Sequence, residues 1–284
     1  MNVTLKPSRI IIFFDGKNNS TQRKQIFSEY KEGRKGKLVV GRHYKFSTEE
    51  SATKNRDYQF FVLRDLLEDL PVSMVVCNGF ETDDAISYCI KHRDFFSLGP
   101  IQIVSCDKDF YQLIDENISI YNPMSKKVLT KKEIIEEYGI HPRNWLLYRS
   151  IVGDSSDNLD GVFGLGPKTL LKIFDLGSET KFDIEDLELL CDAVLEEQTE
   201  KNKSVLKNIQ KIKESMAIIK RNWQLMNLAT PMVSSLSSEV LDAAIQEKEL
   251  RYKKLDFWKK SAKHSVGLNL SLFDDFKHLT RINK

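Results

Sequence analysis

Short apolar runs rich in β-branched residues alternate with amphipathic helical patterns over the first half of the chain. The strand candidates are residues 10–14, 73–77, 101–105 and, as a weaker fourth, 118–121. Between them, residues 57–70 and 83–92 carry apolar side chains at the three-to-four spacing of a helix. This alternation predicts the α/β class, with a parallel sheet and flanking helices. In such sheets ligands collect at the carboxyl ends of the strands.

The second half reads as helical from about residue 131 onward. We expect helices over residues 132–138 and 142–152, then a glycine-punctuated turn, then a helix over residues 169–174. Further on, Val205, Ile209, Ile212, Met216 and Ile219 mark one face of a long, otherwise charged helix, and we interpret that face as a packing surface. The expected organisation is therefore an α/β core over residues 1–125 and a helical region over residues 126–284.

Eight carboxylates lie where the predicted strands end or where the glycine turn begins. They are Asp15, Glu81, Asp83, Asp84, Asp107, Asp109, Asp154 and Asp157. Any one of them could be an ordinary capping or turn residue. A cluster of eight would repel and destabilise the fold unless cations occupied it. Oxygen ligands without histidine or cysteine favour Mg²⁺ or Mn²⁺, and two such ions can support hydrolysis of a phosphodiester.

Two further features suit a polyanionic partner. A glycine-rich turn that opens a helix, as in residues 161–169, can present backbone N–H groups to a phosphate. Between residues 17 and 45, only Glu29 and Glu32 oppose a run of basic residues. The run consists of Lys17, Arg23, Lys24, Lys31, Arg34, Lys35, Lys37, Arg42 and Lys45. A solvated loop is the alternative interpretation of this run.

Composition adds few constraints. The 284 residues carry a formal net charge of only +2, so total charge does not indicate nucleic acid binding. The four cysteines form no CxxC pair and are typical of free thiols in a reducing cytoplasm. No apolar run reaches the length of a membrane span, and no signal peptide is visible. We therefore expect a soluble protein of the cytoplasm, or of the host cytoplasm if a phage encodes it.

Four blocks in order resemble the 5′-nuclease family, that is, the flap endonucleases and 5′→3′ exonucleases, especially the compact phage type that also removes RNA primers. The resemblance covers about residues 9 to 177. The blocks are Phe13-Phe14-Asp15-Gly16 with Tyr30-Lys31-Glu32-Gly33-Arg34, then Glu81-Thr82-Asp83-Asp84-Ala85, then Ser105-Cys106-Asp107-Lys108-Asp109-Phe110, and Gly153-Asp154-Ser155-Ser156-Asp157-Asn158 with the glycine turn up to Lys168.

The resemblance implies a PIN-like parallel sheet, an arch region at about residues 31–58 and a helix–three-turn–helix DNA-binding element at about residues 145–177. It implies that Asp15, Glu81, Asp83, Asp107 and Asp109 hold the catalytic metal pair, with Asp84, Asp154 and Asp157 completing the cluster. Lys31 and Arg34 would polarise the scissile phosphate at the base of the arch, to which the basic residues from Lys35 to Lys45 belong. The glycine turn would grip the duplex backbone, with Gly164, Gly166 and Lys168 as the candidates for this grip, and family members often bind K⁺ there.

The function implied is a Mg²⁺-dependent 5′-nuclease (a phosphodiesterase) that acts on replication intermediates. Its substrates would be DNA with a 5′ flap or a single-strand/duplex junction, and an RNA–DNA hybrid as for a ribonuclease H. The family usually begins with an additional strand that ends in an Asp-Gly pair, and the residues before residue 10 are too few to hold it. We expect that a second polypeptide supplies this strand in trans; a mis-assigned translation start, an interrupted gene or a fold that has closed over the gap are the alternatives. A smaller departure from the family pattern is Asp160.

Three other functions are alternatives to a 5′-nuclease. A P-loop ATPase would need a lysine where Pro167 stands, and proline has no N–H to offer a phosphate. A catalytically impaired, structure-specific DNA-binding protein would keep the duplex grip without cleavage. A single-strand ribonuclease of the PIN-like type fits the acids, but it would not need the glycine turn.

Overall fold

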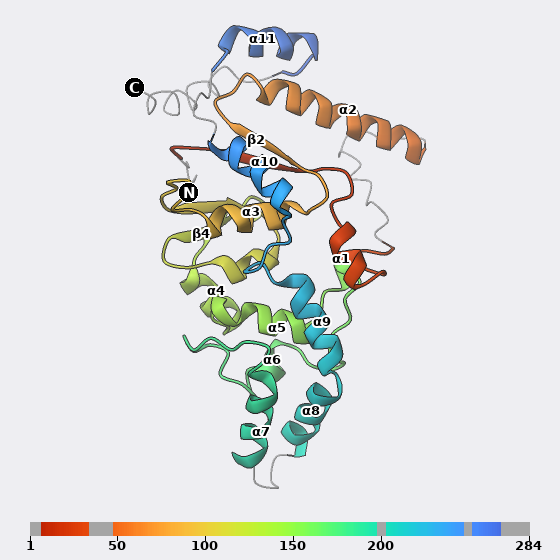
Figure 1. Ribbon diagram of the computed structural model, residues 1–284, viewed down its shortest axis with the longest axis vertical. Helices are drawn as coiled ribbons and strands as arrows, with labels where there is room; N and C mark the ends of the chain where they lie inside the picture. Colours follow the sequence, from red (N-terminus) through yellow and green to blue (C-terminus); the bar gives the residue numbers. More distant parts are fainter. Residues whose placement is uncertain (1–6, 34–47, 198–202, 247–251, 268–284) are drawn as a thin grey trace. The chain divides into compact units, whose positions relative to one another are not determined.

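The structure is a computed structural model, and it describes residues 7–33, 48–197, 203–246 and 252–267 (Figure 1). The chain divides into two compact units. The first unit comprises residues 1–17, 34–78 and 234–284, and the second comprises residues 18–33 and 79–233. The sequence led us to expect an α/β core and a helical region that meet near residue 125. That residue lies inside the second unit, so the two units differ from the two expected regions.

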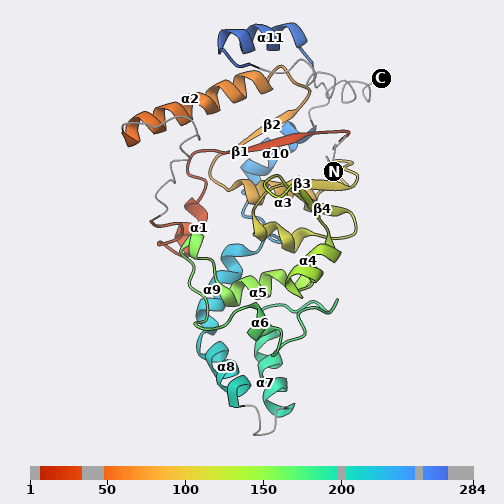
Figure 2. The same ribbon diagram turned by 180° about the vertical axis from the view of Figure 1, so that it is seen from behind.

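The first unit is built on a parallel pair of strands, β1 (Ile11–Asp15) and β2 (Ser73–Cys77), in register from Ile11 opposite Ser73 to Asp15 opposite Cys77 (Figure 2). Its helices are α2 (Glu49–Leu67), α10 (Ser235–Gln246) and α11 (Lys254–Lys263). Helix α2 begins well before the expected residue 57, because Thr48 and Ser51 form a reciprocal capping box at its start. The buried core of the unit comprises Val62, Leu66, Leu70, Val72 and Phe257.

The second unit contains the sheet β3 (Ile101–Val104), β4 (Ile118–Asn122) and β5 (Lys127–Leu129). Strands β3 and β4 are parallel, and β5 adds to β4 in the antiparallel direction. All four predicted strands are therefore present, but among the described residues they form two sheets, and the short β5 was not predicted. Helices α1 (Thr21–Ile26) and α3 (Thr82–Lys91) complete this part, with a 3₁₀ turn over Lys108–Leu113 after β3.

The remaining helices of the second unit are α4 (Lys131–Tyr138), α5 (Trp145–Val152), α6 (Pro167–Leu170), α7 (Leu187–Glu197), α8 (Lys203–Glu214) and α9 (Met216–Met226). The predicted second helix opens as a 3₁₀ turn over Pro142–Asn144. The predicted helix over residues 169–174 is wrong: the short α6 ends at Leu170 and turns follow. The long charged helix is also interrupted, since α8 and α9 meet at Ser215.

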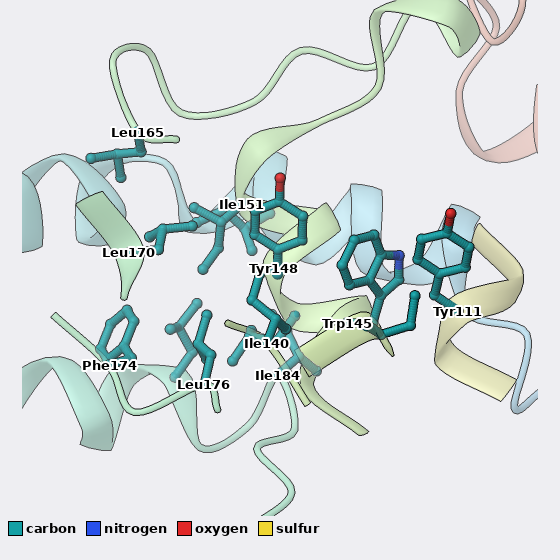
Figure 3. Close-up of a cluster of buried hydrophobic side chains, with 14 of the residues drawn as sticks. Tyr111, Ile140, Trp145, Tyr148, Ile151, Leu165, Leu170, Phe174, Leu176 and Ile184 are labelled. Atoms are coloured by element: carbon teal, nitrogen blue, oxygen red, sulfur yellow. The ribbon is translucent and has the colours of Figure 1, made fainter. Parts of the chain in front are cut away.

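The core of the second unit includes Trp145 of α5, beside Tyr111 and Tyr148 (Figure 3). The Trp145 ring lies 4.9 Å from the ring of Tyr111 and 5.1 Å from that of Tyr148, measured between centroids. Farther along α5, Ile151 packs in the same core as Leu165 of the glycine turn and Leu170 of α6. Buried apolar side chains therefore fix the glycine turn against α5.

Two expectations from composition can be compared with the structure. All four cysteines are free thiols, as predicted, and Cys77, Cys89 and Cys191 are buried while Cys106 is exposed. Within the described parts of the chain, no helix has the length and apolar character needed to cross a membrane.

Candidate metal centre and nucleic-acid interface

The predicted carboxylates are divided between the two units. Asp15 ends β1 in the first unit and is exposed. The other seven lie in the second unit, at the start of α3, after β3 and after α5. The participation of Asp15 in a shared metal site stays a prediction.

Three acids interact around the start of α3. Glu81 is the N-cap of α3, Asp83 lies in its first turn, and Asp107 caps the 3₁₀ turn that follows β3. Burial, and then the negative charges of Asp107 and Glu81, raise the pKa of Asp83 to about 8, although Lys31 and Arg23 oppose the shift. A carboxylate that resists ionisation for this reason is a place where a cation would be stabilised.

Arg149 of α5 joins two further acids. Its Nε lies 3.0 Å from a carboxylate oxygen of Asp109, and its Nη2 forms an ion pair with Asp154. Burial raises the pKa of Asp109 to about 6, with Asp107 and Asp154 adding to the shift and Arg149 reducing it. Burial also acts to raise the pKa of Asp154, but hydrogen bonds from Ser156 and the charge of Arg149 bring it below its usual value.

The adjacent residues Tyr30 and Lys31 connect Glu81 with Asp157. The Lys31 Nζ lies 2.7 and 2.8 Å from the two carboxylate oxygens of Glu81. The hydroxyl of Tyr30 lies 3.3 Å from Glu81 and 3.0 Å from Asp157. The backbone N–H of Lys31 donates to the Asp157 carbonyl at 2.9 Å. Tyr30 and Lys31 are thus bound both to the start of α3 and to the segment that follows α5.

Asp84 has different surroundings from the other acids. It is fully buried, and Arg23 of α1 binds its two carboxylate oxygens at 2.5 and 3.1 Å. The Met232 N–H also donates to Asp84 at 3.0 Å, and Arg23 donates to the Leu225 carbonyl at 2.9 Å. Both oxygens of Asp84 therefore have protein partners, and its direct coordination of a metal stays a prediction.

The carboxylate oxygens at this site are the kind of donor that a hard divalent cation prefers. In the structure, however, several of these carboxylates are paired with lysine or arginine side chains. Among the residues that the structure describes, no three His, Cys, Asp or Glu side chains are arranged to hold a metal ion. Lys31 pairs with Glu81, and Arg149 pairs with Asp109 and Asp154. The repulsion on Asp83 and the oxygen-only donor set nevertheless suit Mg²⁺ or Mn²⁺, with Glu81, Asp83, Asp107 and Asp109 as the residues that would hold it.

The glycine turn is held between α5 and α9. Val162 N–H donates to the Ile151 carbonyl, and the Asn222 side chain of α9 donates to the carbonyls of Ser150 and Asp160. Gly164 has the positive φ of 80° that favours glycine, Gly166 is the N-cap of α6, and Lys168 is exposed. Asp160 is exposed at the same turn. The role of this turn as a duplex grip stays a prediction.

The predicted basic cluster is only partly described. Lys31 lies within the described residues, whereas Arg34, Lys35, Lys37, Arg42 and Lys45 lie outside them. Sequence reasoning missed the roles of Arg23, Tyr30 and Arg149. Tyr30 carried a signal because it opens one of the blocks that resemble the family, and Arg23 was part of the basic run. The pairings of Arg23 with Asp84 and of Arg149 with Asp109 join segments far apart in the sequence, and no local pattern reveals them.

Comparisons with known proteins agree with this fold. Residues 2–139 match the family described as 5′-3′ exonuclease, N-terminal resolvase-like domain. The chain is 31% identical over 169 residues to a 5′-3′ exonuclease of Aquifex aeolicus, which covers 59% of this chain and 52% of that protein. It is 33% identical over 185 residues to a 5′-3′ exonuclease of Buchnera aphidicola, covering 64% of this chain and 57% of the relative. The match thus spans about half the length of these curated relatives.

Solved structures share the fold at lower identity. The 5′-exonuclease of T5 with divalent zinc ions bound has a TM-score of 0.63 and 20% identity, covering 84% of this chain and 82% of that one. The flap endonuclease of bacteriophage T5 in complex with DNA and metal ions has a TM-score of 0.61 and 19% identity, covering 89% and 84%. The matched domain and the 5′-3′ exonuclease relatives support a place for the chain in the 5′-nuclease family, and the solved structures share its fold.

Proposed function

We propose that this chain is a metal-dependent 5′→3′ exonuclease and structure-specific flap endonuclease that hydrolyses phosphodiester bonds in replication intermediates. The observation that carries the proposal is the carboxylate cluster of the second unit, in which burial and then the negative charges of Asp107 and Glu81 raise the pKa of Asp83 to about 8. The 5′-3′ exonuclease relatives support the same chemistry.

The acids would hold divalent ions, Mg²⁺ in the cell with Mn²⁺ as a substitute. Bound ions would supply activation of a water molecule and stabilisation of charge on the leaving oxygen. Asp83 would ionise as a cation approaches, because the cation offsets the repulsion from Asp107 and Glu81. Lys31, whose ammonium is partly exposed, would exchange its contact with Glu81 for the scissile phosphate, and Arg34 would assist.

DNA with a 5′ flap or a single-strand/duplex junction would be the substrate, with RNA–DNA hybrids as a second class. Gly164, Gly166 and Lys168 would contact the duplex backbone as part of a helix–three-turn–helix element, with K⁺ as a further ligand there. A second polypeptide could supply an additional strand, and the reaction would take place in the cytoplasm.

Cleavage of a labelled 5′-flap DNA tests the proposal. We expect the wild-type chain, alone or with a peptide that supplies the additional strand, to cleave in Mg²⁺ and to stop in EDTA. Asp107→Ala and Asp109→Ala should lower the rate at least about 100-fold, as expected when groups acting on the transition state are removed. Asp192→Ala, an exposed acid of α7, is the matched control and should cleave at the wild-type rate.

One observation favours a second candidate, a DNA-binding protein of the same family with impaired catalysis. Lys31 and Arg149 already neutralise Glu81, Asp109 and Asp154. Flap binding without metal-dependent cleavage, under every condition above, would support this candidate and contradict the nuclease.

A further inference from the structure

Three lysines form a stripe along one face of α8. Lys203, Lys207 and Lys211 are four residues apart, so they lie on the same side of the helix at intervals of about 6 Å. The opposite face of α8 consists of Val205, Ile209 and Ile212, which are buried in the core of the second unit. The lysine stripe therefore points away from the core, and Lys203 and Lys207 are exposed.

The stripe differs from the other lysines of the neighbouring helices. Lys213 pairs with Asp192 of α7, and the Lys220 Nζ of α9 lies 3.1 Å from Glu188 of α7. Within the described residues, no ion pair joins a lysine of the stripe to a carboxylate. Glu214 lies one turn beyond Lys211 and accepts a hydrogen bond from Gln210 at 2.9 Å. The positive charge of the stripe is thus largely uncompensated.

One end of the stripe meets the glycine turn. The Lys211 Nζ donates to the carbonyl of Phe163 at 3.1 Å and lies 5.9 Å from the centroid of the Phe163 ring. Phe163 itself is 90% exposed at the tip of the turn. The stripe and the turn therefore belong to one continuous surface of the second unit, in which α8 lies beside α7 (Figures 1 and 2).

We propose that Lys203, Lys207 and Lys211 bind the phosphate backbone of duplex nucleic acid and extend the contact that begins at the glycine turn. The stripe covers about 12 Å, which corresponds to three or four base-pair steps of about 3.4 Å. Charge complementarity favours this occupant, because a row of ammonium groups that have no carboxylate partner among the described residues matches a regular row of phosphates. The inference rests on one part of the proposed function, namely that the glycine turn contacts duplex DNA. It does not require that the chain cleaves DNA.

The test is the salt dependence of duplex binding by the full chain, measured by fluorescence anisotropy in EDTA so that no cleavage occurs. Replacing all three lysines, as Lys203→Gln, Lys207→Gln and Lys211→Gln together, should reduce the slope of log affinity against log salt by about 2–3, since each phosphate contact contributes about 0.9. Each single replacement should remove about 0.9. The control carries Lys213→Gln and Lys220→Gln, whose lysines pair with α7, and should keep the wild-type slope.

The outcomes separate this inference from the nuclease function. A triple variant with the wild-type slope would overturn the stripe even if the wild type cleaves flaps, and so would a wild type that does not bind duplex. A reduced slope in a chain that never cleaves would support the stripe and contradict the nuclease. Binding of polyaspartate by the same variants tests an acidic protein as the occupant. If the triple variant loses polyaspartate binding but binds the duplex as the wild type does, the surface belongs to an acidic protein and the proposal is overturned. If the triple variant fails to fold, the single variants decide.

Discussion

Arginine and lysine side chains control the charge of the candidate metal centre at the level of single residues. Arg23 is buried against Asp84, Lys31 contacts Glu81, and Arg149 bridges Asp109 and Asp154. These ion pairs give four of the carboxylates a protein cation as a partner. Asp83 is the acid for which burial and neighbouring acids outweigh the attraction of Lys31 and Arg23.

The raised pKa of Asp83 predicts a pH-dependent stability in the absence of metal. The carboxyl holds its proton in the folded chain up to a pKa of about 8, against an ordinary value of 3.8. The folded state therefore binds more protons than the unfolded state between these values, so stability falls as the pH rises through this range. Asp83→Asn should remove that loss and raise stability at pH 8 by about 1–3 kcal/mol, with little effect near pH 4.

Thermal unfolding in EDTA at both pH values measures this effect. The control is Asp192→Asn, an exposed acid paired with Lys213, which should gain nothing at the higher pH. An equal change in Tm at pH 4 and pH 8 for Asp83→Asn would show that the Asp83 carboxylate is not under electrostatic strain.

Arg149 should act as an internal substitute for part of the metal charge. Arg149→Gln leaves Asp109 and Asp154 without their cation, and both side chains are 16% exposed. We expect a loss of about 1–3 kcal/mol in EDTA, because unpaired, partly buried carboxylates are costly. Mg²⁺ should restore more stability to this variant than to the wild type. Calorimetry with and without Mg²⁺ measures the difference, and an equal Mg²⁺ effect on both proteins would contradict the assigned role.

Sequence position predicted the acids but not their partners. Glu81, Asp83, Asp107 and Asp109 were predicted because they follow strands, and Asp83 and Asp107 do interact across α3 and the turn after β3. The pairing of Arg149 with Asp109 joins residues 40 positions apart, which periodicity cannot reveal. Tertiary packing, not local pattern, decides which cation meets which acid.

At the level of elements, the packing of α5 against α9 positions the glycine turn. Asn222 is fully buried and caps the carbonyls of Ser150 and Asp160, at 3.1 and 2.8 Å. The backbone of Gly161 passes so close to the end of α5 that a Cβ there would overlap the carbonyl of Val152. The turn thus depends on a backbone contact that only glycine permits.

Two glycines of the turn should respond differently to alanine. Gly161→Ala must displace backbone atoms of α5 and should destabilise the protein by about 3 kcal/mol or more, in the range typical of severe core strain. Gly166→Ala meets no atom within 4 Å and has a negative φ of −117°, so it should change stability by less than about 1 kcal/mol. Chemical denaturation measures both, and equal losses would contradict the close approach at Gly161.

The elements themselves were predictable to different extents. Strand β2 has the predicted bounds at both ends. Its residues alternate between buried and partly buried positions, as in a strand that packs on one face. The break between α8 and α9 was missed, since Ser215 is neither glycine nor proline and the apolar spacing continues through it. Strand β5 was missed because it has only three residues and depends on pairing with β4.

At the scale of the whole molecule, the pattern of ion pairs indicates a nucleic acid surface better than the net charge does. The formal charge is +2, yet lysines paired with acids on α7 lie close in sequence to the unpaired stripe on α8. The sequence alone assigned no chemistry to residues beyond 178, because charged helices look alike until their partners are known. Nucleic acid binding therefore depends on where charge is uncompensated, not on its total.

Binding of Mn²⁺ to the full chain, followed by electron paramagnetic resonance, tests the central claim most directly. The account predicts saturable binding by the wild type and by Asp192→Asn. Asp83→Asn and Asp107→Asn should bind at least about tenfold more weakly, a loss of about 1.4 kcal/mol. Equal Mn²⁺ affinity in all four proteins, or no saturable binding by any of them, would contradict a shared carboxylate metal centre.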